Sequence, residues 1–566
     1  MLERKSIASI ITSYDQKMIF DILSSYDGSK AIVWDRKLMK QMNVIISPKV
    51  LAERAVSSNL ALDEPVDVKV DHVIYLLAPT LDSITMLTQN FLKPLTKNDK
   101  RLHHVMFVPE VSHNLREKLK PFKGVESITS LPIRWFPTEN PLFITLNQPN
   151  LLYKILIDED WLELYKCANS IYQLERQMGQ VPTIRCKGEW SAKIVEMLKK
   201  IRMSNEKVEL GEKLDVDEII LIDRWLDPIT PVLTQLTFGG CIDEFYSIDV
   251  QGKIRVPSKE YDASGPSTNE QHIDIHLNND ELYDQLQDQH IYAIGSKIRE
   301  VLNELREEEK QLQTLSVAEM KVHIKSIPKL IKKKHSVDTF TRVAEMIQAG
   351  LVDDFNFGII QCEKEILSGC PSDKMIPFIE NAIIEAKHSF RILRLICLHS
   401  LVCNGLKSAV LQSYRKLFIQ SYGVEMLALW TRLQIAGLIK EESQTDKLSR
   451  KYNNPMNFSS ANRQMKLVIN EFSENNPKDT SYAYSGYASL LIRYIEAGFH
   501  NGWRDWTTIN GSIPVARSSM NRLLFVVGGI TRAEMSCVRT FLPMIQFCST
   551  TNVLSGDKLI QAFQSL

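Results

Sequence analysis

Apolar residues in the first part of the chain form short, β-rich runs separated by polar stretches that are able to form helices. The runs are AIVW at 31–34, HVIYLL at 72–77 and VMFV at 105–108. Alternating strands and helices are typical of parallel strands joined by helical crossovers. The pattern therefore predicts an α/β domain with a doubly wound parallel sheet over residues 1–131.

A second α/β region follows, and its most apolar strand, Ile219–Ile222, ends in charged residues. Asp223, Arg224 and Asp227 come directly after the strand. Two carboxylates at a strand end suit Mg²⁺ binding or acid–base chemistry, and they equally suit an ion pair with Arg224 that fixes a turn. No phosphate-binding loop or ligand cluster accompanies them, which favours the ion pair. The alternative is a nucleotide-dependent enzyme that uses Asp223 and Asp227.

Prolines, glycines and helix caps predict where the neighbouring elements begin and end. A helix is expected to start near Pro231, where the missing N–H has no helical partner to lose, and to end at Gly239–Gly240. Near the C-terminus, the apolar run Leu523–Val527 predicts a further strand of the same sheet. Thr531 and Glu534 then have the spacing of a capping box at the start of the last long helix.

From residue 290 onward the apolar pattern changes to the three–four spacing of a helix. Two such stretches are joined by a short connection, which predicts an antiparallel helical hairpin. Their apolar positions are Ile291, Ile294, Ile298, Val301 and Leu305, and then Val317, Met320, Ile324, Ile327 and Ile331. Residues 251–279, which precede the hairpin, are polar and rich in turn formers, and we expect a surface loop there.

The second stretch of the hairpin carries a proline and a row of lysines. Pro328 removes one helical hydrogen bond, so a kink or local unwinding is expected. The lysines on one flank are Lys321, Lys325, Lys329, Lys332 and Lys333. Such a row suits a solvated face, a seat for a partner helix with acidic flanks, or a site for acidic lipid or RNA.

The composition is that of an ordinary globular protein without a charge imbalance. Apolar residues make up 44% and charged residues 24% of the 566 positions, and 68 basic residues balance 68 acidic ones. A net charge of zero argues against a dedicated nucleic-acid binder. The nine cysteines lack zinc-binding spacing, no G-x-G-x-x-G follows a strand, and no apolar run approaches the roughly 18 residues that span a bilayer. We expect no metal, no cofactor and no transmembrane segment.

Several segments resemble the SM (Sec-one/Munc-eighteen) family of SNARE-binding proteins. The most specific is DRWLDPITPVLTQLTFGGCIDEF at 223–245, which is similar to the family's signature. VIYLLAPTLDSI at 73–84 and SIPKLIKKKHSVDTFTRVAEMI at 326–347 resemble its first domain and its hairpin. The form of the signature resembles the vacuolar branch, vacuolar protein sorting-associated protein 33, and YAYSGY at 482–487 favours the A-like member. The matching segments run through nearly the whole chain in the family's order.

The resemblance implies a three-domain arch with two doubly wound parallel-sheet domains and an inserted, mostly helical domain that carries the hairpin. The expected bounds are 1–131 for domain 1, 132–248 with 482–566 for domain 2, 249–350 for domain 3a and 351–481 for domain 3b. The cleft between domains 1 and 3a is expected to be the working surface.

The resemblance also implies four sets of site residues. Hairpin contacts with a VAMP-type SNARE are Leu315, Met320, Ile324, Ile327, Pro328, Ile331 and Lys332. Domain 1 contacts with a syntaxin-type SNARE are Asp35, Arg36 and Lys40. Contacts with a tether subunit, vacuolar protein sorting-associated protein 16, are Arg415, Val424 and Leu427. The structural signature consists of Asp223, Arg224, Asp227, Thr230 and Pro231.

The function implied by the resemblance is non-enzymatic. The protein would hold syntaxin-type and VAMP-type SNARE motifs side by side and template their assembly, which lowers the ordering cost of a disordered partner. It would do so as a subunit of a HOPS or CORVET tethering complex during endosome–lysosome or vacuole fusion. We expect a cytoplasmic protein that is peripheral on late endosome, lysosome or vacuole membranes through its complex.

Overall fold

The computed structural model describes residues 7–64, 68–93, 99–122, 124–140, 142–204, 216–261, 271–314, 327–369, 375–442, 457–510 and 520–564. The chain forms two compact units. The smaller contains residues 1–146 and 249–252, and the larger contains residues 147–248 and 253–566. Within the described ranges, no helix combines the length and the apolar character needed to cross a bilayer.

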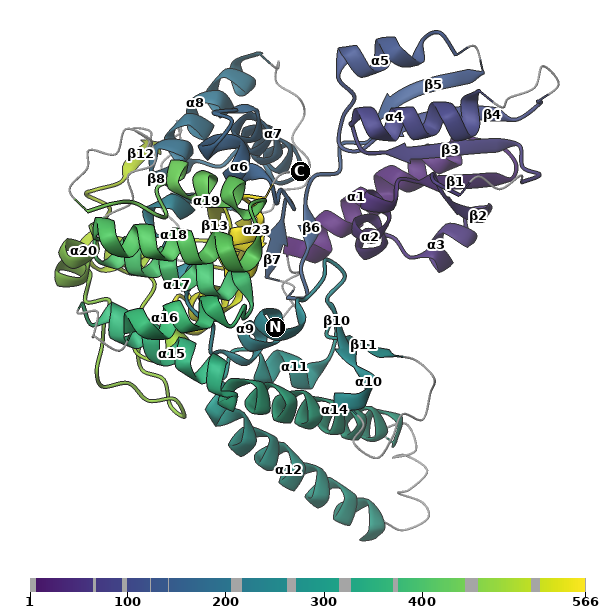
Figure 1. Ribbon diagram of the computed structural model, residues 1–566. Helices are drawn as coiled ribbons and strands as arrows, with labels where there is room; N and C mark the ends of the chain where they lie inside the picture. The colour runs from purple at the N-terminus through teal and green to yellow at the C-terminus, as the bar shows by residue number, and fades with distance from the viewer. Residues whose placement is uncertain are drawn as a thin grey trace. The chain divides into compact units, whose positions relative to one another are not determined.

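The smaller unit is built on a five-stranded, all-parallel sheet in the order β2-β1-β3-β4-β5 (Figure 1). Three of its strands, β1, β3 and β4, coincide with the apolar runs of the sequence and confirm the predicted parallel α/β arrangement. Apolar cores lie on both faces of the sheet, which is why these strands are continuously apolar. The elements are β1 (Lys30–Trp34), β2 (Val56–Ala61), β3 (His72–Leu77), β4 (Leu102–Phe107), β5 (Val125–Ser130), β6 (Phe136–Pro137), β7 (Phe143–Thr145), α1 (Ile7–Ser24), α2 (Arg36–Ile45), α3 (Pro48–Ala52), α4 (Leu81–Leu87) and α5 (His113–Leu119).

The larger unit contains a second sheet, in which strands from distant parts of the sequence are neighbours. Within this unit its strands lie in the order β12-β8-β9-β13-β15, with β12 antiparallel to β8 and the other pairs parallel. Ile219 of β9 pairs with Leu523 of β13, which confirms that the C-terminal apolar run completes this sheet. The strands are β8 (Thr183–Lys187), β9 (Glu218–Asp223), β12 (Thr507–Asn510), β13 (Arg522–Val527) and β15 (Phe547–Thr550), with two small pairs formed by β10 (Lys253–Pro257) and β11 (His272–His276) and by β14 (Ile530–Thr531) and β16 (Val553–Leu554).

The helices of the larger unit include those that cover this sheet and those of the mostly helical part. Helix α8 packs on β8 and β9, and α12 and α14 lie side by side (Figure 1). The helices are α6 (Leu151–Leu156), α7 (Leu162–Met178), α8 (Glu189–Ser204), α9 (Phe238–Tyr246), α10 (Ser258–Tyr261), α11 (Glu281–Leu286), α12 (Ile294–Thr314), α14 (Ile327–Val352), α15 (Asp354–Leu367), α16 (Met375–Ile384), α17 (Ser389–Val402), α18 (Ser408–Tyr422), α19 (Met426–Ile435), α20 (Phe458–Met465), α21 (Leu490–Asn501), α22 (Arg532–Phe541) and α23 (Gly556–Gln561).

The helix predicted between Pro231 and Gly239–Gly240 is wrong, because α9 begins where it was expected to end. Pro231 lies in a short 3₁₀ turn, and Thr237 is the N-cap of α9, with its Oγ1 accepting from the N–H of Gly240 at 3.2 Å. A Cβ on Gly240 would lie 2.7 Å from the Cβ of Gln235. The glycine therefore permits close packing at a helix start and does not terminate a helix.

The capping box predicted at Thr531 and Glu534 is confirmed at the start of α22. The Thr531 side chain accepts from the N–H of Glu534, and the Glu534 carboxylate accepts from the N–H of Thr531 at 3.0 Å. The segment 251–279, which was expected to be a surface loop, instead contains β10, α10 and β11 within its described residues. Its buried Ile254, Val256, Ile275 and Leu277 belong to the same core as α12 and α14, so four apolar positions dock this segment.

The apolar positions predicted for the first hairpin helix all lie inside the protein. Ile291, Ile294, Ile298, Val301 and Leu305 are at most 5% exposed. They pack in one core with Val337, Phe340 and Ile347 of α14. The predicted seam is thus an intramolecular contact between α12 and α14. The connection between the two helices, residues 315–326, lies outside the described residues, as does the approach to Pro328.

Candidate functional site

The charged cluster after β9 forms a buried ion-pair network. Arg224 is fully buried, and its Nη1 donates to both carboxylate oxygens of Glu534 at 2.8 and 2.7 Å. Its Nη2 lies 3.2 Å from Asp227 Oδ2, and Asp227 Oδ1 accepts from the N–H of Thr230 at 3.0 Å. Ser489 Oγ, just before α21, donates to Glu534 Oε1 at 2.6 Å. The ion-pair interpretation is confirmed for Arg224 and Asp227, and the network joins three distant segments.

Asp223 is also buried, but its carboxylate is held by hydrogen bonds from the start of α8. It accepts from the N–H groups of Trp190 and Ser191 at 2.7 and 2.8 Å, and from Ser191 Oγ. Burial raises the pKa of Asp223 to about 7. A Cβ added to Gly188 would lie 2.1 Å from Oδ2, so the carboxylate packs directly against the backbone just before α8. Among the described residues there is also no group of three metal-ligating side chains. The arrangement suits a structural pin between β9 and α8.

The three residues assigned to the domain 1 wall have different surroundings. Asp35 is 8% exposed and caps α2, with Oδ1 accepting from the N–H of Lys37 at 3.0 Å and Oδ2 accepting from Ser83 Oγ at 2.6 Å. Arg36 is exposed and pairs with Asp63 at 2.6 Å. Lys40 is exposed on the same helix. Asp35 therefore sets the start of α2, Arg36 is exposed but paired with Asp63 and Glu64, and Lys40 presents a cation to solvent.

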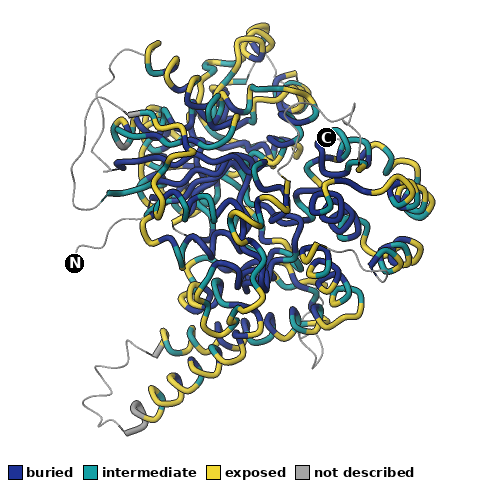
Figure 2. Tube along the Cα trace, turned by 90° about the vertical axis from the view of Figure 1, so that its left-hand side faces the viewer, coloured by how far each residue is buried: buried dark blue, intermediate teal, exposed yellow. Residues whose placement is uncertain are grey.

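The described hairpin residues form an exposed face on α14. Ile331 is 62% exposed, and Pro328 and Lys332 are also exposed. Figure 2 shows the α12–α14 pair exposed along much of its length. Lys332 Nζ donates to the backbone carbonyl of Asn279 at 3.3 Å. Leu315, Met320 and Ile324 lie outside the described residues, and so does the side chain of Ile327, so those assignments stay predictions.

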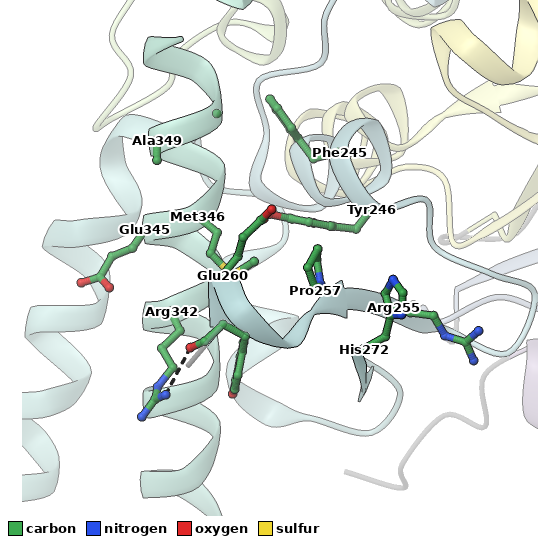
Figure 3. Close-up of a pocket in the computed structure, with 12 residues that line it drawn as sticks. Phe245, Tyr246, Arg255, Pro257, Glu260, His272, Arg342, Glu345, Met346 and Ala349 are labelled. Carbon is green, nitrogen blue, oxygen red and sulfur yellow. Dashed lines mark hydrogen bonds between the residues drawn. The ribbon is translucent and has the colours of Figure 1, made fainter. Parts of the chain in front are cut away.

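A groove of about 1050 Å³ opens on the same face of α14 (Figure 3). By helical spacing, Arg342, Glu345 and Ala349 of the groove lie on the side of α14 that carries Ile331. The opposite wall contains Phe245 and Tyr246 from the end of α9. The remaining lining residues are Arg255, Pro257, Glu260, Tyr261, His272, Met346 and Gly350.

Polar contacts fix the walls of this groove. Arg342 lies 3.2 Å from Asp338 Oδ2 and donates to the backbone carbonyl of Tyr261 at 3.2 Å. In Figure 3 the Glu260 side chain extends toward Tyr246, and burial, with a contribution from Glu260, raises the pKa of the Tyr246 hydroxyl to about 12. The groove thus combines aromatic and aliphatic surface with charges of both signs, a composition suited to an amphipathic segment.

The sequence does not predict this groove, because its walls come from four segments that only the folded chain brings together. One signal was available: the seven-, four-, three- and four-residue steps from Ile331 through Asp338, Arg342, Glu345 and Ala349 mark one helical face that is poor in large apolar residues. On that face Ile331 is exposed, and a solvated helix face has no need of an isoleucine there.

The residues assigned to tether binding lie on α18 and at the start of α19. Arg415 is exposed on α18, and Val424 between the two helices is 71% exposed. Leu427 is half-buried in the first turn of α19. Behind them, the Phe418 and Trp430 rings pack 5.8 Å apart, centroid to centroid. The structure thus places Val424 and Leu427 at the turn between the two helices and Arg415 midway along α18.

Comparisons with known proteins agree over nearly the full length. The model of the Sec1 family matches residues 30–562. Vacuolar protein sorting-associated protein 33A of Caenorhabditis elegans is 34% identical over 575 residues, covering 97% of this chain and 94% of the relative. The rat protein of the same name is 28% identical over 578 residues, covering 95% and 94% of the two chains.

Two solved structures have a similar fold. The Unc18–syntaxin 1 complex from Monosiga brevicollis aligns with a TM-score of 0.67 and 16% identity, covering 99% of each chain. The SM protein Vps45 in complex with the Qa SNARE Tlg2 aligns with a TM-score of 0.65 and 15% identity, covering 99% of this chain and 97% of Vps45. Both were solved with a SNARE partner bound.

Proposed function

The chain belongs to the Sec1 family, and from that premise we propose that it binds syntaxin-type and VAMP-type SNARE motifs and templates their assembly. Proteins of this family are non-enzymatic SNARE regulators, which sets aside the nucleotide-dependent enzyme built on Asp223 and Asp227. The bonding of both carboxylates within the protein agrees with that assignment.

The exposed face of α14 is the observation that carries the proposal. SNARE motifs are amphipathic helices, and such helices bind by placing apolar side chains on a complementary face. Ile331 supplies apolar surface at one end of α14, and the groove beside Phe245, Tyr246 and Met346 supplies it at the other. A partner helix lying along this face would meet both.

We assign the VAMP-type motif to α14 and the syntaxin-type motif to the exposed cations of α2, Arg36 and Lys40. Holding the two motifs on one protein replaces a bimolecular encounter with an effectively intramolecular one. Each motif also loses part of its conformational entropy when it binds this protein, so less remains to be lost when the two motifs assemble. Complexes of Vps45 and Unc18 with syntaxin-type partners support the syntaxin assignment.

We further propose that the protein works within a HOPS- or CORVET-type tethering complex at late endosomes, lysosomes or vacuoles. The similarity to vacuolar protein sorting-associated protein 33A supports this placement. The surface of α18 and α19 that carries Arg415, Val424 and Leu427 is proposed to contact the tether subunit, vacuolar protein sorting-associated protein 16. An exposed valine beside buried aromatics is a suitable centre for such a contact.

A direct test compares the full-length protein with two matched variants in pull-downs with soluble VAMP-type and syntaxin-type SNARE motifs. Ile331→Asp should weaken VAMP-type capture by about tenfold or more, because it places an unpaired charge in an apolar contact. Ile384→Asp, at the end of α16, is the control, since Ile384 is 60% exposed and Ile331 is 62% exposed. Equal capture by wild type and both variants would refute the α14 assignment.

Binding of acidic lipid or RNA through the lysine row is less well supported. Lys333 and Lys334 both pair with glutamates of α12, which reduces the positive field that such ligands need. The exposed Ile331 favours the partner-helix interpretation of the lysine row.

A further inference from the structure

The lysines near Ile331 are held by acidic residues of the neighbouring helix. Lys333 Nζ lies 3.4 Å from Glu308 Oε1 and 3.9 Å from Glu304 Oε2, and Lys334 pairs with Glu309. Lys334 follows Ile331 by three positions, so the two side chains are neighbours on the helix surface. The cation beside the exposed isoleucine is therefore already partnered within the protein.

From this arrangement we infer that Glu308 and Glu309 tune the specificity of the α14 face, because they weaken its response to negative charge on a partner helix. The inference rests on the proposed function. An acidic flank on a partner helix gains energy from Lys333 and Lys334 only by displacing the α12 carboxylates. Since one acidic contact replaces another, the net gain from these two lysines is close to zero.

The geometry supports competition and not a permanent block. Lys333 and Lys334 keep 32% and 54% of their side-chain surface exposed, and Glu308 and Glu309 keep 51% and 32%. Ion pairs this accessible to water are weak and exchange readily. The apolar part of the face, represented by Ile331, is not covered by these pairs, because it remains mostly exposed. A partner with the right apolar spacing can bind, whereas an acidic helix without it gains little.

This specificity matters for a surface that works among many acidic chains. A lysine row without internal partners would attract any acidic helix at low ionic strength. The same α12 also provides a matched control, because Glu300 and Glu307 pair with Lys297 and Lys310 on α12 itself, three residues away in each case. Removing those two carboxylates changes the net charge equally but leaves Lys333 and Lys334 paired.

The experiment uses the full-length protein and two synthetic helices with identical apolar heptads taken from a VAMP-type motif. One helix carries glutamates on its flank and the other carries glutamines at the same positions. Affinities are measured by fluorescence anisotropy for wild type, the double variant Glu308→Gln with Glu309→Gln, and the control double variant Glu300→Gln with Glu307→Gln. Melting temperatures of the three proteins establish that each is folded.

Wild type and control should show the same small preference between the two helices. The Glu308→Gln, Glu309→Gln variant should prefer the acidic helix by about threefold at low salt, and the preference should disappear near 0.5 M salt, where roughly 4 Å of screening length remains. The same preference in all three proteins, or in none, would overturn the inference while leaving SNARE binding intact.

A result in which no protein binds either helix would instead refute the proposed function, and the inference would then be decided by lysine reactivity in the free protein. Acylation of Lys333 and Lys334 by an amine-reactive ester, followed by mass spectrometry, should be faster in the Glu308→Gln, Glu309→Gln variant than in the control. Equal rates would overturn the inference by this second route.

Discussion

Two regions of the larger unit use the same pairing of cation and carboxylate with opposite consequences. In the cluster after β9, Arg224 and Glu534 are both fully buried, and every contact described for the guanidinium is to the protein. On the α12–α14 pair, Lys333 and Lys334 meet Glu308 and Glu309 at the surface. The difference in solvent access decides what each pair can do.

A buried ion pair is costly to break, because the remaining charge keeps its desolvation penalty after its partner is lost. The Arg224 network therefore fixes how β9, α21 and α22 pack. An exposed pair exchanges with water at little cost, so it adds little to stability but can be replaced by a partner's charge. The first arrangement builds the fold, and the second adjusts recognition.

The largest expected effect comes from removing the central cation. Arg224→Met should destabilise the larger unit by about 3–5 kcal/mol, because Asp227 and Glu534 are left buried without their cation. Arg255→Met is the control, since the Arg255–Asp274 pair is 68% and 43% exposed and should change stability by less than about 0.5 kcal/mol. Urea denaturation of the full chain measures both, and similar losses would break the comparison.

A second variant tests the space that accommodates Arg224. Gly528 has φ +102°, and a Cβ there would lie 2.8 Å from the Cβ of Arg224. Gly528→Ala should cost about 2–3 kcal/mol through strain and overpacking. Gly502→Ala is the matched control, because Gly502 also has positive φ, at +76°, but has no described atom within 4 Å of the added Cβ. That control should lose about 1 kcal/mol in the same denaturation assay. Equal losses would show that proximity to Arg224 is unimportant.

Asp15 of α1 extends the comparison to a buried carboxylate for which the described residues show no partner at Oδ1. It is 1% exposed, and burial raises its pKa to about 8 from an ordinary 3.8. The folded state thus holds a proton that the unfolded state releases, and stability should fall as pH rises from about 4 to about 8.

Asp15→Asn should remove this part of the pH dependence between pH 5 and pH 8. Thermal melts of wild type and variant across that range measure it, and parallel curves for the two proteins would contradict the assignment. Asp21→Asn, at an exposed position of the same helix, is the control.

The smallest effect is expected at the exposed pairs. Glu308→Gln with Glu309→Gln should change the free energy of unfolding by less than about 1 kcal/mol, because each lost pair is open to water. The same melts measure it. A loss as large as that of Arg224→Met would remove the distinction between the two regions.

Local signals in the sequence predicted a large part of the fold. The apolar runs at 31–34, 72–77 and 105–108 became parallel strands, and the capping box at Thr531 formed as expected. Long-range pairing of β9 and β13 was also predicted, since a continuously apolar strand needs neighbouring strands to bury it. The error at Pro231 arose because a glycine required by packing against Gln235 has the same appearance in sequence as one that ends a helix.

The candidate site was less accessible from the sequence. The charged signature was found, but the partner of each carboxylate depended on what packs beside it. Asp223 accepts hydrogen bonds from the start of α8, whereas Asp227 pairs with Arg224. The lysine row was found as well, yet its pairing with α12 depended on how two helices pack. Neither question is decided by spacing along one helix.

By itself, the sequence determined the classes of element, the family signature and which helix face carries Ile331, because these depend on residue order and helical or strand period alone. Only the tertiary structure decided which charges are buried and which partner each one meets. The physical reason is that the strength of an ion pair depends on its solvent exposure, and exposure is a property of the packed chain and not of any single segment.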